Sequence, residues 1–436
     1  MDYFDFQNET LDRNELEELQ LERLQKTVER ALQLPFYKSR LEEAGIEKAA
    51  QIQSLEDLRK IPFTTKSDLR TGYPEGFLAV DKSEVVRIHT SSGTTGKPTV
   101  IYHTQNDIDN WADLVARCMA ATGADSEDVF QNMTGYGLFT GGLGMHYGAE
   151  KIGMSVIPTG SGNTEKQLEM MKDFNTTIVH ATPSYLLHLY DKIQESTYSM
   201  EDFSLEKAFL GAEFYSKNTS KKIENLYDID VYNSYGLSEM NGPGVAFDCS
   251  YKEGMHIWED NYIVEVIDPE TGELLDEGES GELVLTIINR EATPILRYRT
   301  HDLTSIIPGE CSCGRSHKRI SRILGRSDDM LIVNGANMFP SQIESVIMKY
   351  PEVGTNYQIH LSKKGSLDQL TVKVELYSKL FNGDTNKLEN LKSQIKEDIK
   401  NKVLVTPKVE LHEPDSLPDQ KGKATRVIDK RYQEEK

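Results

Sequence analysis

The stretch IHTSSGTTGKPTV, residues 88–100, places one lysine, Lys97, in a loop of small and hydroxyl residues. A Walker A loop requires glycine, four residues and then Gly-Lys-Ser/Thr at the start of a helix. Here only Thr94 and Thr95 separate two glycines, and a proline follows the lysine. Because proline disfavours a helical conformation of the preceding residue, we predict a mobile loop between two strands. Such a loop can close over phosphates through its backbone N–H groups, although a flexible linker has the same composition.

The composition indicates a globular protein of two or three domains, since the chain has 436 residues and a domain takes roughly 100–200. The net charge of −21 argues against nucleic acid or an anionic membrane surface as a partner. The acidic start does not resemble a signal peptide, and no apolar run approaches the roughly 20 residues that span a bilayer. Four cysteines are too few for a disulfide framework. We therefore expect a cytoplasmic protein.

The order of predicted elements indicates an α/β fold. Strand-like and helical stretches alternate from VVRIHT (residues 85–90) to SYLLHLYDKIQ (residues 184–194), which predicts a layered body. The chain becomes β-rich from residue 261, where two strands are expected around a Pro-Glu-Thr-Gly turn. A small α+β domain with a charged helix over residues 386–402 is expected at the end. An amphipathic helix is predicted over residues 15–34.

Four further motifs follow the loop in a fixed order: YNSYGLSEM (residues 232–240), YRTHDL (298–303), GRSDD (325–329) and GKATR (422–426). With these motifs the chain resembles, over nearly its whole length, the acyl-adenylate-forming superfamily of acyl-CoA synthetases, luciferases and peptide synthetase adenylation domains. GMHIWEDNYIVEVIDPETGE and GRSDDMLIVNGANMFPSQIE resemble its phenylacetate–coenzyme A ligase branch. The resemblance implies a large multi-subdomain body over residues 1–326, with a helical lead-in over residues 1–75, and a mobile domain over residues 327–436.

The implied reaction converts a carboxylate, whose leaving group would be oxide, into an acyl-adenylate whose leaving group is AMP. The resemblance implies ATP, Mg²⁺, coenzyme A and an aromatic acid such as phenylacetate. Benzoate, an aminobenzoate or indoleacetate is an alternative acid, and a carrier-protein pantetheine is an alternative acceptor. A nucleotide-sensing relative is a third alternative, against which the intact Lys97, Glu239, Asp302 and Lys423 argue. The sequence leaves a homodimer open.

The resemblance also implies which residues contact the nucleotide. The set is Ser91, Ser92, Gly93, Thr94, Thr95, Gly96, Lys97, Gly211, Ala212, Glu213, Asn233, Tyr235, Gly236, Asp302 and Arg326. The loop is implied to hold the β- and γ-phosphates, Asp302 the ribose hydroxyls, and Glu239 the Mg²⁺, which prefers carboxylate and phosphate oxygens. Without the resemblance, Glu239 could simply start a helix, and Asp302 could be a turn aspartate that bonds its own backbone.

Three residues of the C-terminal domain match functional positions of the family. Asp328 matches the hinge, and Gly335 matches the stretch that faces the site during thioester formation, where a glycine lets the pantetheine pass. Lys423 matches the lysine that bridges the carboxylate and the α-phosphate. The alternatives are ordinary turns for Asp328 and Gly335 and a solvated tail for Lys423, with Lys421 as the next candidate for the lysine role.

The acid pocket is predicted in NMTGYGLFTGGLGMHYGAE, residues 132–150, with Tyr136 and Phe139 as candidate pocket residues and Tyr147 nearby. Six glycines beside aromatic residues suit a flat acid that lies against the backbone, whereas ordinary core packing explains the aromatic residues equally well.

The cysteines favour a zinc site outside the nucleotide chemistry. Cys249, His256, Cys311 and Cys313 supply three thiolates and one imidazole, a closed tetrahedral set for structural zinc. Reduced cysteines without a metal are the alternative. Cys118 lies in a predicted helix and is expected in the core.

Overall fold

The computed structural model describes residues 3–91, 97–364, 367–377, 385–414, 416–418 and 426–431. Its contacts divide the chain into two units. The first unit comprises Met1–His180, Lys207–Gly211 and Tyr232–Ile323, and the second comprises Ala181–Glu206, Ala212–Val231 and Leu324–Lys436.

The first unit begins with helices. They are α1 (Phe6–Glu9), α2 (Arg13–Ala31), α3 (Pro35–Glu43) and α4 (Lys66–Thr71). Helix α2 starts because the side chain of Asp12 accepts hydrogen bonds from two backbone N–H groups of the first turn. It buries Leu16, Leu24 and Val28 on one face. It ends three residues earlier than predicted, since Pro35 occupies the first turn of the next helix.

The loop of residues 88–100 lies between paired strands, as predicted. Strand β1 (Arg87–Thr90) pairs antiparallel with β2 (Val100–His103), so that Thr90 is opposite Val100. Residues 92–96, which include Ser92, Gly93, Thr94, Thr95 and Gly96, lie outside the described residues. The paired strands therefore bring Ser91 and the start of β2 together at the base of the loop.

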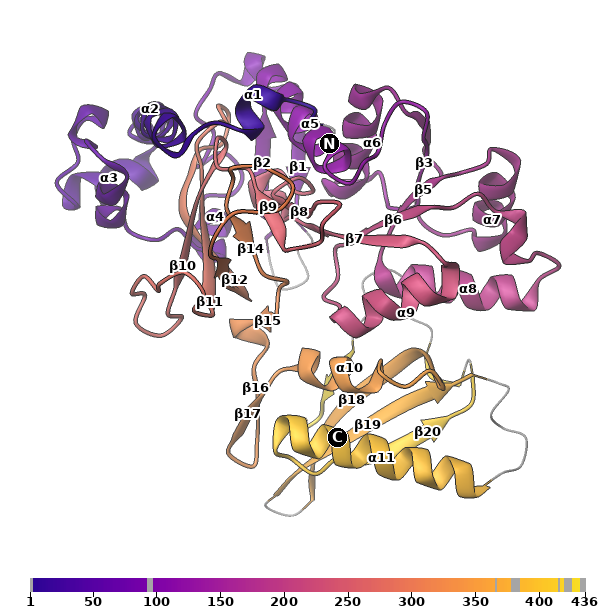
Figure 1. Cartoon of the computed structure of the whole chain (residues 1–436). Helices are drawn as coiled ribbons and strands as arrows, with labels where there is room; N and C mark the ends of the chain where they lie inside the picture. The colour runs from indigo at the N-terminus through magenta and orange to yellow at the C-terminus, as the bar shows by residue number, and fades with distance from the viewer. Residues whose placement is uncertain are drawn as a thin grey trace. The chain divides into compact units, whose positions relative to one another are not determined.

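A nine-stranded sheet forms the centre of the first unit, in the order β13-β14-β9-β8-β7-β6-β5-β3-β4 (Figure 1). Its strands are β3 (Val129–Asn132), β4 (Ser155–Ile157), β5 (Ile178–Ala181), β6 (Lys207–Gly211), β7 (Asp230–Tyr235), β8 (Ala246–Asp248), β9 (Met255–Ile257), β13 (Ile306–Ile307) and β14 (Arg319–Ile320). Strand β3 pairs parallel with β4 and β5, whereas β7, β8 and β9 pair antiparallel. The parallel part agrees with the predicted alternation of strands and helices.

Three helices and a second sheet complete the unit. The helices are α5 (Gln105–Ala120), α6 (Gly141–Ile152) and α7 (Thr164–Asp173), and the sheet contains the antiparallel strands β10 (Tyr262–Ile267), β11 (Gly281–Ile287) and β12 (Ile295–Thr304). A Cβ atom on Gly144 would lie 2.5 Å from Trp111, and one on Gly148 would lie 2.4 Å from Val115. These two glycines of α6 therefore permit its close approach to α5.

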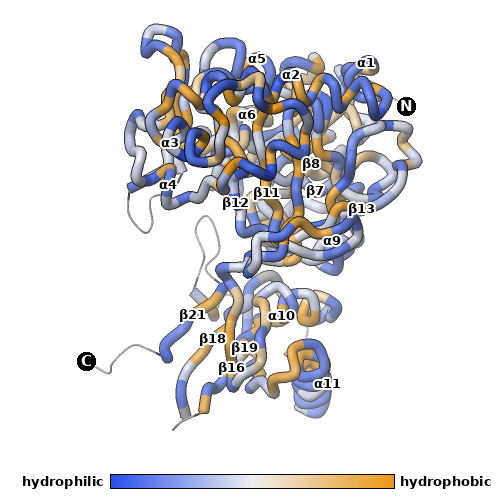
Figure 2. The backbone as a smooth tube through the Cα atoms, turned by 90° about the vertical axis from the view of Figure 1, so that its left-hand side faces the viewer, coloured by the Kyte–Doolittle hydropathy of each residue, from blue (hydrophilic) through white to orange (hydrophobic). Residues whose placement is uncertain are grey.

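The second unit combines helices with a small mixed sheet. Its elements are α8 (Pro183–Glu195), α9 (Lys217–Tyr227), β15 (Gly325–Arg326), β16 (Leu331–Val333), β17 (Ala336–Met338), α10 (Pro340–Ile347), β18 (Val353–Lys364), β19 (Leu367–Leu376), α11 (Thr385–Val403), β20 (Lys408–His412) and β21 (Val427–Asp429). The sheet order is β20-β19-β18-β21. Helix α11 is largely hydrophilic in Figure 2 and buries residues at four-residue spacing, among them Leu391, Ile395 and Ile399.

The hairpin of β16 and β17 is fastened to the rest of the second unit. Asn334 donates to the backbone oxygen of Asp368 (2.8 Å), and the backbone N–H of Asp368 donates to the side chain of Asn334 (2.8 Å). Arg431, just after β21, pairs with Asp368 (3.0 Å) and Asp429 (2.7 Å) and donates to the backbone oxygen of Ile332 (2.5 Å). The hairpin and β21 are thus joined through one guanidinium group.

These elements confirm the predicted fold class, an α/β body with a β-rich section and a small α+β portion at the C-terminal end. All four cysteines are free thiols. Among the residues that the structure describes, no helix has both the length and the apolar character needed to span a membrane.

Candidate active site and metal centre

Glu239 lies in a short 3₁₀ turn, Ser238–Met240, which follows β7 after two intervening residues. Its side chain is buried, and Oε1 lies 3.1 Å from Thr99 Oγ1 and 3.5 Å from Lys66 Nζ. The turn therefore starts no α-helix, and it presents a carboxylate whose position is fixed by a hydroxyl and a cation. Such an oxygen donor is suited to Mg²⁺.

Thr99 connects this carboxylate to the base of the phosphate loop. Thr99 is fully buried, and its Oγ1 lies 2.7 Å from Ser91 Oγ. Two further bonds join these residues: Ser91 N–H donates to the Thr99 backbone oxygen (3.1 Å), and Thr99 N–H donates to the Ser91 side-chain oxygen Oγ (3.1 Å). Lys97 Nζ lies 5.5 Å from the centre of the Tyr73 ring. Thr99 was not predicted, and nothing in its sequence context marks it.

Two other predicted nucleotide residues lie together. Tyr235, at the end of β7, donates from its hydroxyl to Asp302 Oδ2 at 2.6 Å. Asp302 belongs to strand β12, so the alternative of a turn aspartate is wrong. His301, directly before it, has φ of 64°, as has Ala212 after β6. Such left-handed residues other than glycine are uncommon and cluster at functional sites.

Two glycines among the predicted nucleotide residues occupy crowded backbone positions in the first unit. A Cβ atom on Gly211 would lie 2.4 Å from the Ser234 oxygen, and one on Gly236 would lie 2.6 Å from the Gly242 Cα. The backbone N–H of Asn233, which is buried, donates to Asp248 Oδ2 at 2.8 Å. The glycines at positions 211 and 236 are therefore required by the packing of the strand ends.

In the second unit, Glu213 and Arg326 already have partners. Glu213 accepts from Ser184 Oγ at 2.9 Å, at the start of α8. Arg326 binds Asp328, the predicted hinge, through two contacts of 2.8 and 3.0 Å. Gly335 has φ of +83° in the turn of the β16–β17 hairpin, and a Cβ atom there would meet no atom within 4 Å. Lys423 lies outside the described residues.

The predicted acid pocket has one half-buried and one exposed aromatic residue. The Tyr136 hydroxyl accepts from Asn132 (2.9 Å) and lies 3.2 Å from His146 Nδ1, and burial raises the pKa of Tyr136 to about 12. Phe139 is 52% exposed. Tyr147 binds Arg87 through its hydroxyl at 3.0 Å. Since the glycines of α6 facing α5 are explained by helix packing, they give no separate support for a pocket.

The four predicted zinc ligands lie together. The ligand atoms of Cys249, His256, Cys311 and Cys313 all lie within 4.8 Å of one another, and all four residues are buried. The sulfurs of Cys249 and Cys311 are 3.7 Å apart, close to the spacing of about 3.8 Å that tetrahedral geometry with Zn–S bonds of about 2.3 Å requires. Hydrogen bonds with Cys249 and then with His256 hold the pKa of the Cys313 thiol well below its usual value. The donor set fits a closed zinc site.

His256 is held by a hydrogen bond on the side of its ring that points away from the cysteines. Its Nδ1 lies 3.3 Å from the backbone oxygen of His317, which can only accept, so Nδ1 carries the proton. The other nitrogen, Nε2, faces Cys313 Sγ at 3.2 Å, which is the orientation that a metal ligand in this cluster requires. A histidine ligand is commonly oriented by such a second hydrogen bond.

Comparison with known protein families shows to which family the chain belongs. The family model described as "AMP-binding enzyme" matches residues 9–287, and the model described as "AMP-binding enzyme C-terminal domain" matches residues 335–431. The chain belongs to the AMP-binding enzyme family. Phenylacetate-coenzyme A ligase of Thermus thermophilus is 44% identical over 97% of this chain and 98% of its own length. The enzyme of the same name from Pseudomonas putida is 44% identical over 97% and 96%.

Solved structures of AMP-binding enzymes share the architecture. A crystal structure of 2-hydroxyisobutyryl-CoA ligase in the postadenylation state, with 2-HIB-AMP, is 28% identical and covers 97% of this chain and 91% of its own, with a TM-score of 0.91. The same ligase with 2-HIB-AMP and CoA in the thioesterification state is 29% identical over 98% and 92%, with a TM-score of 0.71. The family match and the full-length similarity to these ligases make the chain an AMP-forming acid–thiol ligase that uses ATP and coenzyme A.

Proposed function

We propose that this AMP-binding enzyme activates phenylacetate, or a similar arylacetate, as an acyl-adenylate and transfers the acyl group to coenzyme A, releasing AMP and pyrophosphate. The observation that carries this proposal is the identity of 43–44%, over nearly the full length, with four phenylacetate-coenzyme A ligases. The contacts between Thr99 and Glu239 and between Tyr235 and Asp302 support it, because they involve residues to which the family resemblance assigns roles in this chemistry.

The first step is assigned to residues of the body. The loop from Ser91 to Lys97 holds the β- and γ-phosphates, and Asp302, oriented by the Tyr235 hydroxyl, accepts from the ribose. Glu239, fixed through Thr99, is the proposed Mg²⁺ ligand. Magnesium bound there would neutralise charge on the phosphates. Lys423 neutralises charge between the substrate carboxylate and the α-phosphate.

The second step is assigned to a rearrangement of the C-terminal domain, residues 327–436, about Asp328. In the second arrangement Gly335 faces the pantetheine, and Lys423 is withdrawn. The Arg326 guanidinium, which is proposed to contact ribose or phosphate, binds Asp328 through Nε and one terminal nitrogen in this structure. We infer that this exposed ion pair is exchanged during the cycle at small cost, because exposed pairs contribute little stability.

The acid preference is tested with a panel of carboxylic acids. We expect phenylacetate to give a kcat/KM at least about ten-fold above that of acetate or a long-chain fatty acid, the discrimination that one to three kcal/mol of pocket contacts provides. Thioester formation with free coenzyme A measures it, and a carrier protein serves as the alternative acceptor. Preference for an aliphatic acid, or for the carrier protein, would contradict the proposal.

We further propose that the cluster of three cysteines and His256 binds structural zinc. Elemental analysis of the purified protein is expected to give about one zinc per chain. Cys311→Ser should lower both the zinc content and the melting temperature, because metal binding contributes to folding free energy. Cys118→Ser is the matched control, since Cys118 is also buried but accepts from Trp258 Nε1 at 3.2 Å, outside the cluster. A purified protein that contains no zinc and is fully stable would contradict the proposed zinc site.

A further inference from the structure

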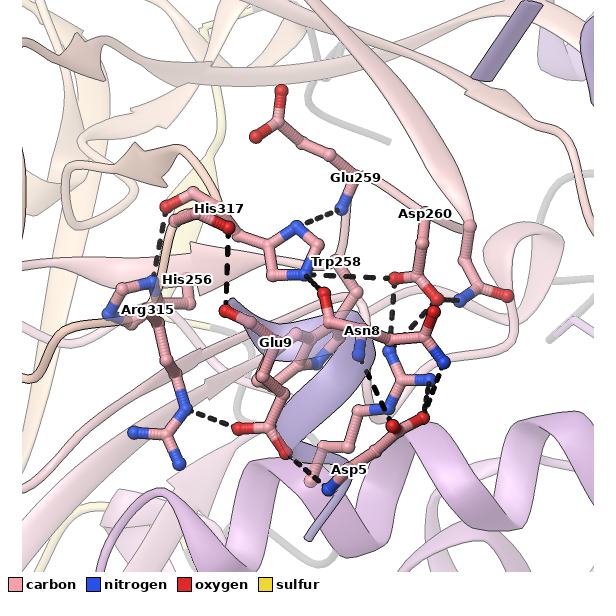
Figure 3. A network of polar contacts seen from close by, with 12 residues as sticks. Asp5, Asn8, Glu9, His256, Trp258, Glu259, Asp260, Arg315 and His317 are labelled. Atoms are coloured by element: carbon pink, nitrogen blue, oxygen red, sulfur yellow. Dashed lines mark hydrogen bonds and ion pairs between the residues drawn. The ribbon is translucent and has the colours of Figure 1, made fainter. Parts of the chain in front are cut away.

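Residues 3–9 (the amino-terminal segment) contact the loop of residues 311–317 (the ligand loop), which carries two of the proposed zinc ligands (Figure 3). The Tyr3 hydroxyl donates to the backbone oxygen of the ligand Cys313 at 3.0 Å. The two stretches are about three hundred residues apart in sequence, and nothing in the nucleotide chemistry explains their contact.

Glu9 is the centre of this contact. It is fully buried, and one carboxylate oxygen accepts from the backbone N–H groups of Phe4 (3.0 Å) and Asp5 (2.8 Å). The other oxygen accepts from Arg315 Nε at 2.6 Å, and Arg315 is itself buried. The backbone oxygen of Glu9 accepts from Ser316 N–H at 3.1 Å. Glu9 therefore folds the segment onto itself and fixes it to the ligand loop at the same time.

A second path leads from the segment to a proposed ligand. The backbone N–H of Glu259 donates to His317 Nδ1 (3.1 Å), so the His317 proton resides on Nε2. From there it is donated to the backbone oxygen of Asn8 at 2.9 Å. The backbone oxygen of His317 accepts from His256 Nδ1. The segment thus holds the residue that sets the His256 tautomer.

We propose that the amino-terminal segment is the cover of the metal centre and that Glu9 is a positioning residue for metal retention. This rests on the proposed zinc site. Through Arg315 and His317 the segment restrains the loop of Cys311 and Cys313 and the orientation of His256. Loss of such outer contacts typically lowers metal affinity by about 10–100-fold. Because coupling is reciprocal, zinc should in turn favour docking of the segment.

The test is zinc release from the loaded full-length protein to a chromogenic chelator. Glu9→Gln keeps the shape of the side chain and removes its charge, and it should speed release at least about ten-fold. Tyr3→Phe removes the hydroxyl that binds the Cys313 backbone, keeps the ring beside Arg315, and should speed release about three-fold. Glu22→Gln is the control, because Glu22 pairs with Lys26 on the exposed surface of α2. Unchanged release in both test variants would overturn the inference.

Two further measurements separate metal retention from ordinary stability. Glu9→Gln should lower the melting temperature of the zinc-loaded protein more than that of the zinc-free protein; equal losses would make Glu9 merely structural and overturn the inference. Hydrogen exchange at Phe4 and Asp5 should accelerate when zinc is removed, and exchange independent of zinc would also overturn it. A protein that takes up no zinc would overturn the proposed zinc site itself. This result is distinct from a zinc-loaded protein whose rate of zinc release is unchanged by these substitutions.

Discussion

Lys423→Ala is expected to lower the rate of acyl-adenylate formation by about 10²–10³-fold, the usual cost of losing one electrostatic contact to the transition state. The proposed bridge between the carboxylate and the α-phosphate matters only while that bond forms. The same variant, supplied with preformed acyl-adenylate and coenzyme A, should therefore form thioester at a nearly normal rate. Pyrophosphate release and thioester formation measure the two half-reactions separately.

Lys421→Ala is the matched control, because it removes an equal charge two residues away and should leave both half-reactions intact. Asp328→Pro should lose one half-reaction and retain the other, since proline fixes φ at the proposed hinge. A Lys423→Ala variant impaired equally in both half-reactions, or in neither, would show that the lysine is assigned wrongly.

Glu239→Gln is expected to reduce adenylate formation by about 10²–10³-fold. Glutamine keeps the oxygen that lies 3.1 Å from Thr99 Oγ1, so the turn after β7 should keep its shape. It removes the charge that the proposed Mg²⁺ site requires. The measurement is pyrophosphate release with saturating phenylacetate and ATP over a range of Mg²⁺ concentrations.

Glu291→Gln is the control for this change. Glu291 also accepts from a threonine hydroxyl, Thr104 Oγ1 at 2.8 Å, and also pairs with a cation, Arg30. It belongs to none of the predicted nucleotide contacts, so its replacement should leave the rate unchanged. Equal effects of the two substitutions, or an unchanged rate and Mg²⁺ dependence in Glu239→Gln, would contradict the role of Glu239.

The fold class could be predicted because local patterns and the final packing agree along most of the chain. The proline after Lys97 predicted a strand rather than a helix, and the structure has strand β2 there. The charged helix predicted over residues 386–402 is α11, Thr385–Val403. Helix α2 ended early for a reason visible in the sequence, since Pro35 starts the next helix. Sheet order and the composition of the two units depend on long-range pairing, which no local pattern encodes.

The site was predictable only where chemistry is carried by unusual residue types. Cysteine and histidine are scarce, so the four proposed metal ligands could be grouped from the sequence alone. Thr99 could not be found, because a buried threonine that bonds a carboxylate does not differ in sequence from one in any strand. The Arg326–Asp328 pair depends on backbone conformation, and the glycines of α6 could not be divided between helix packing and pocket without the neighbouring side chains.

The link through Arg431 has a consequence for the order of events in the catalytic cycle. Arg431 joins Asp368 and the backbone of Ile332 to the end of β21, and Lys423 precedes β21 by only a few residues in the sequence. In the proposed rearrangement, the β16–β17 hairpin that carries Gly335 and strand β21 therefore move together rather than one after the other. Under that proposal, a molecule whose hairpin serves the thiol would have its lysine withdrawn from the acid, and the two half-reactions would exclude each other in time.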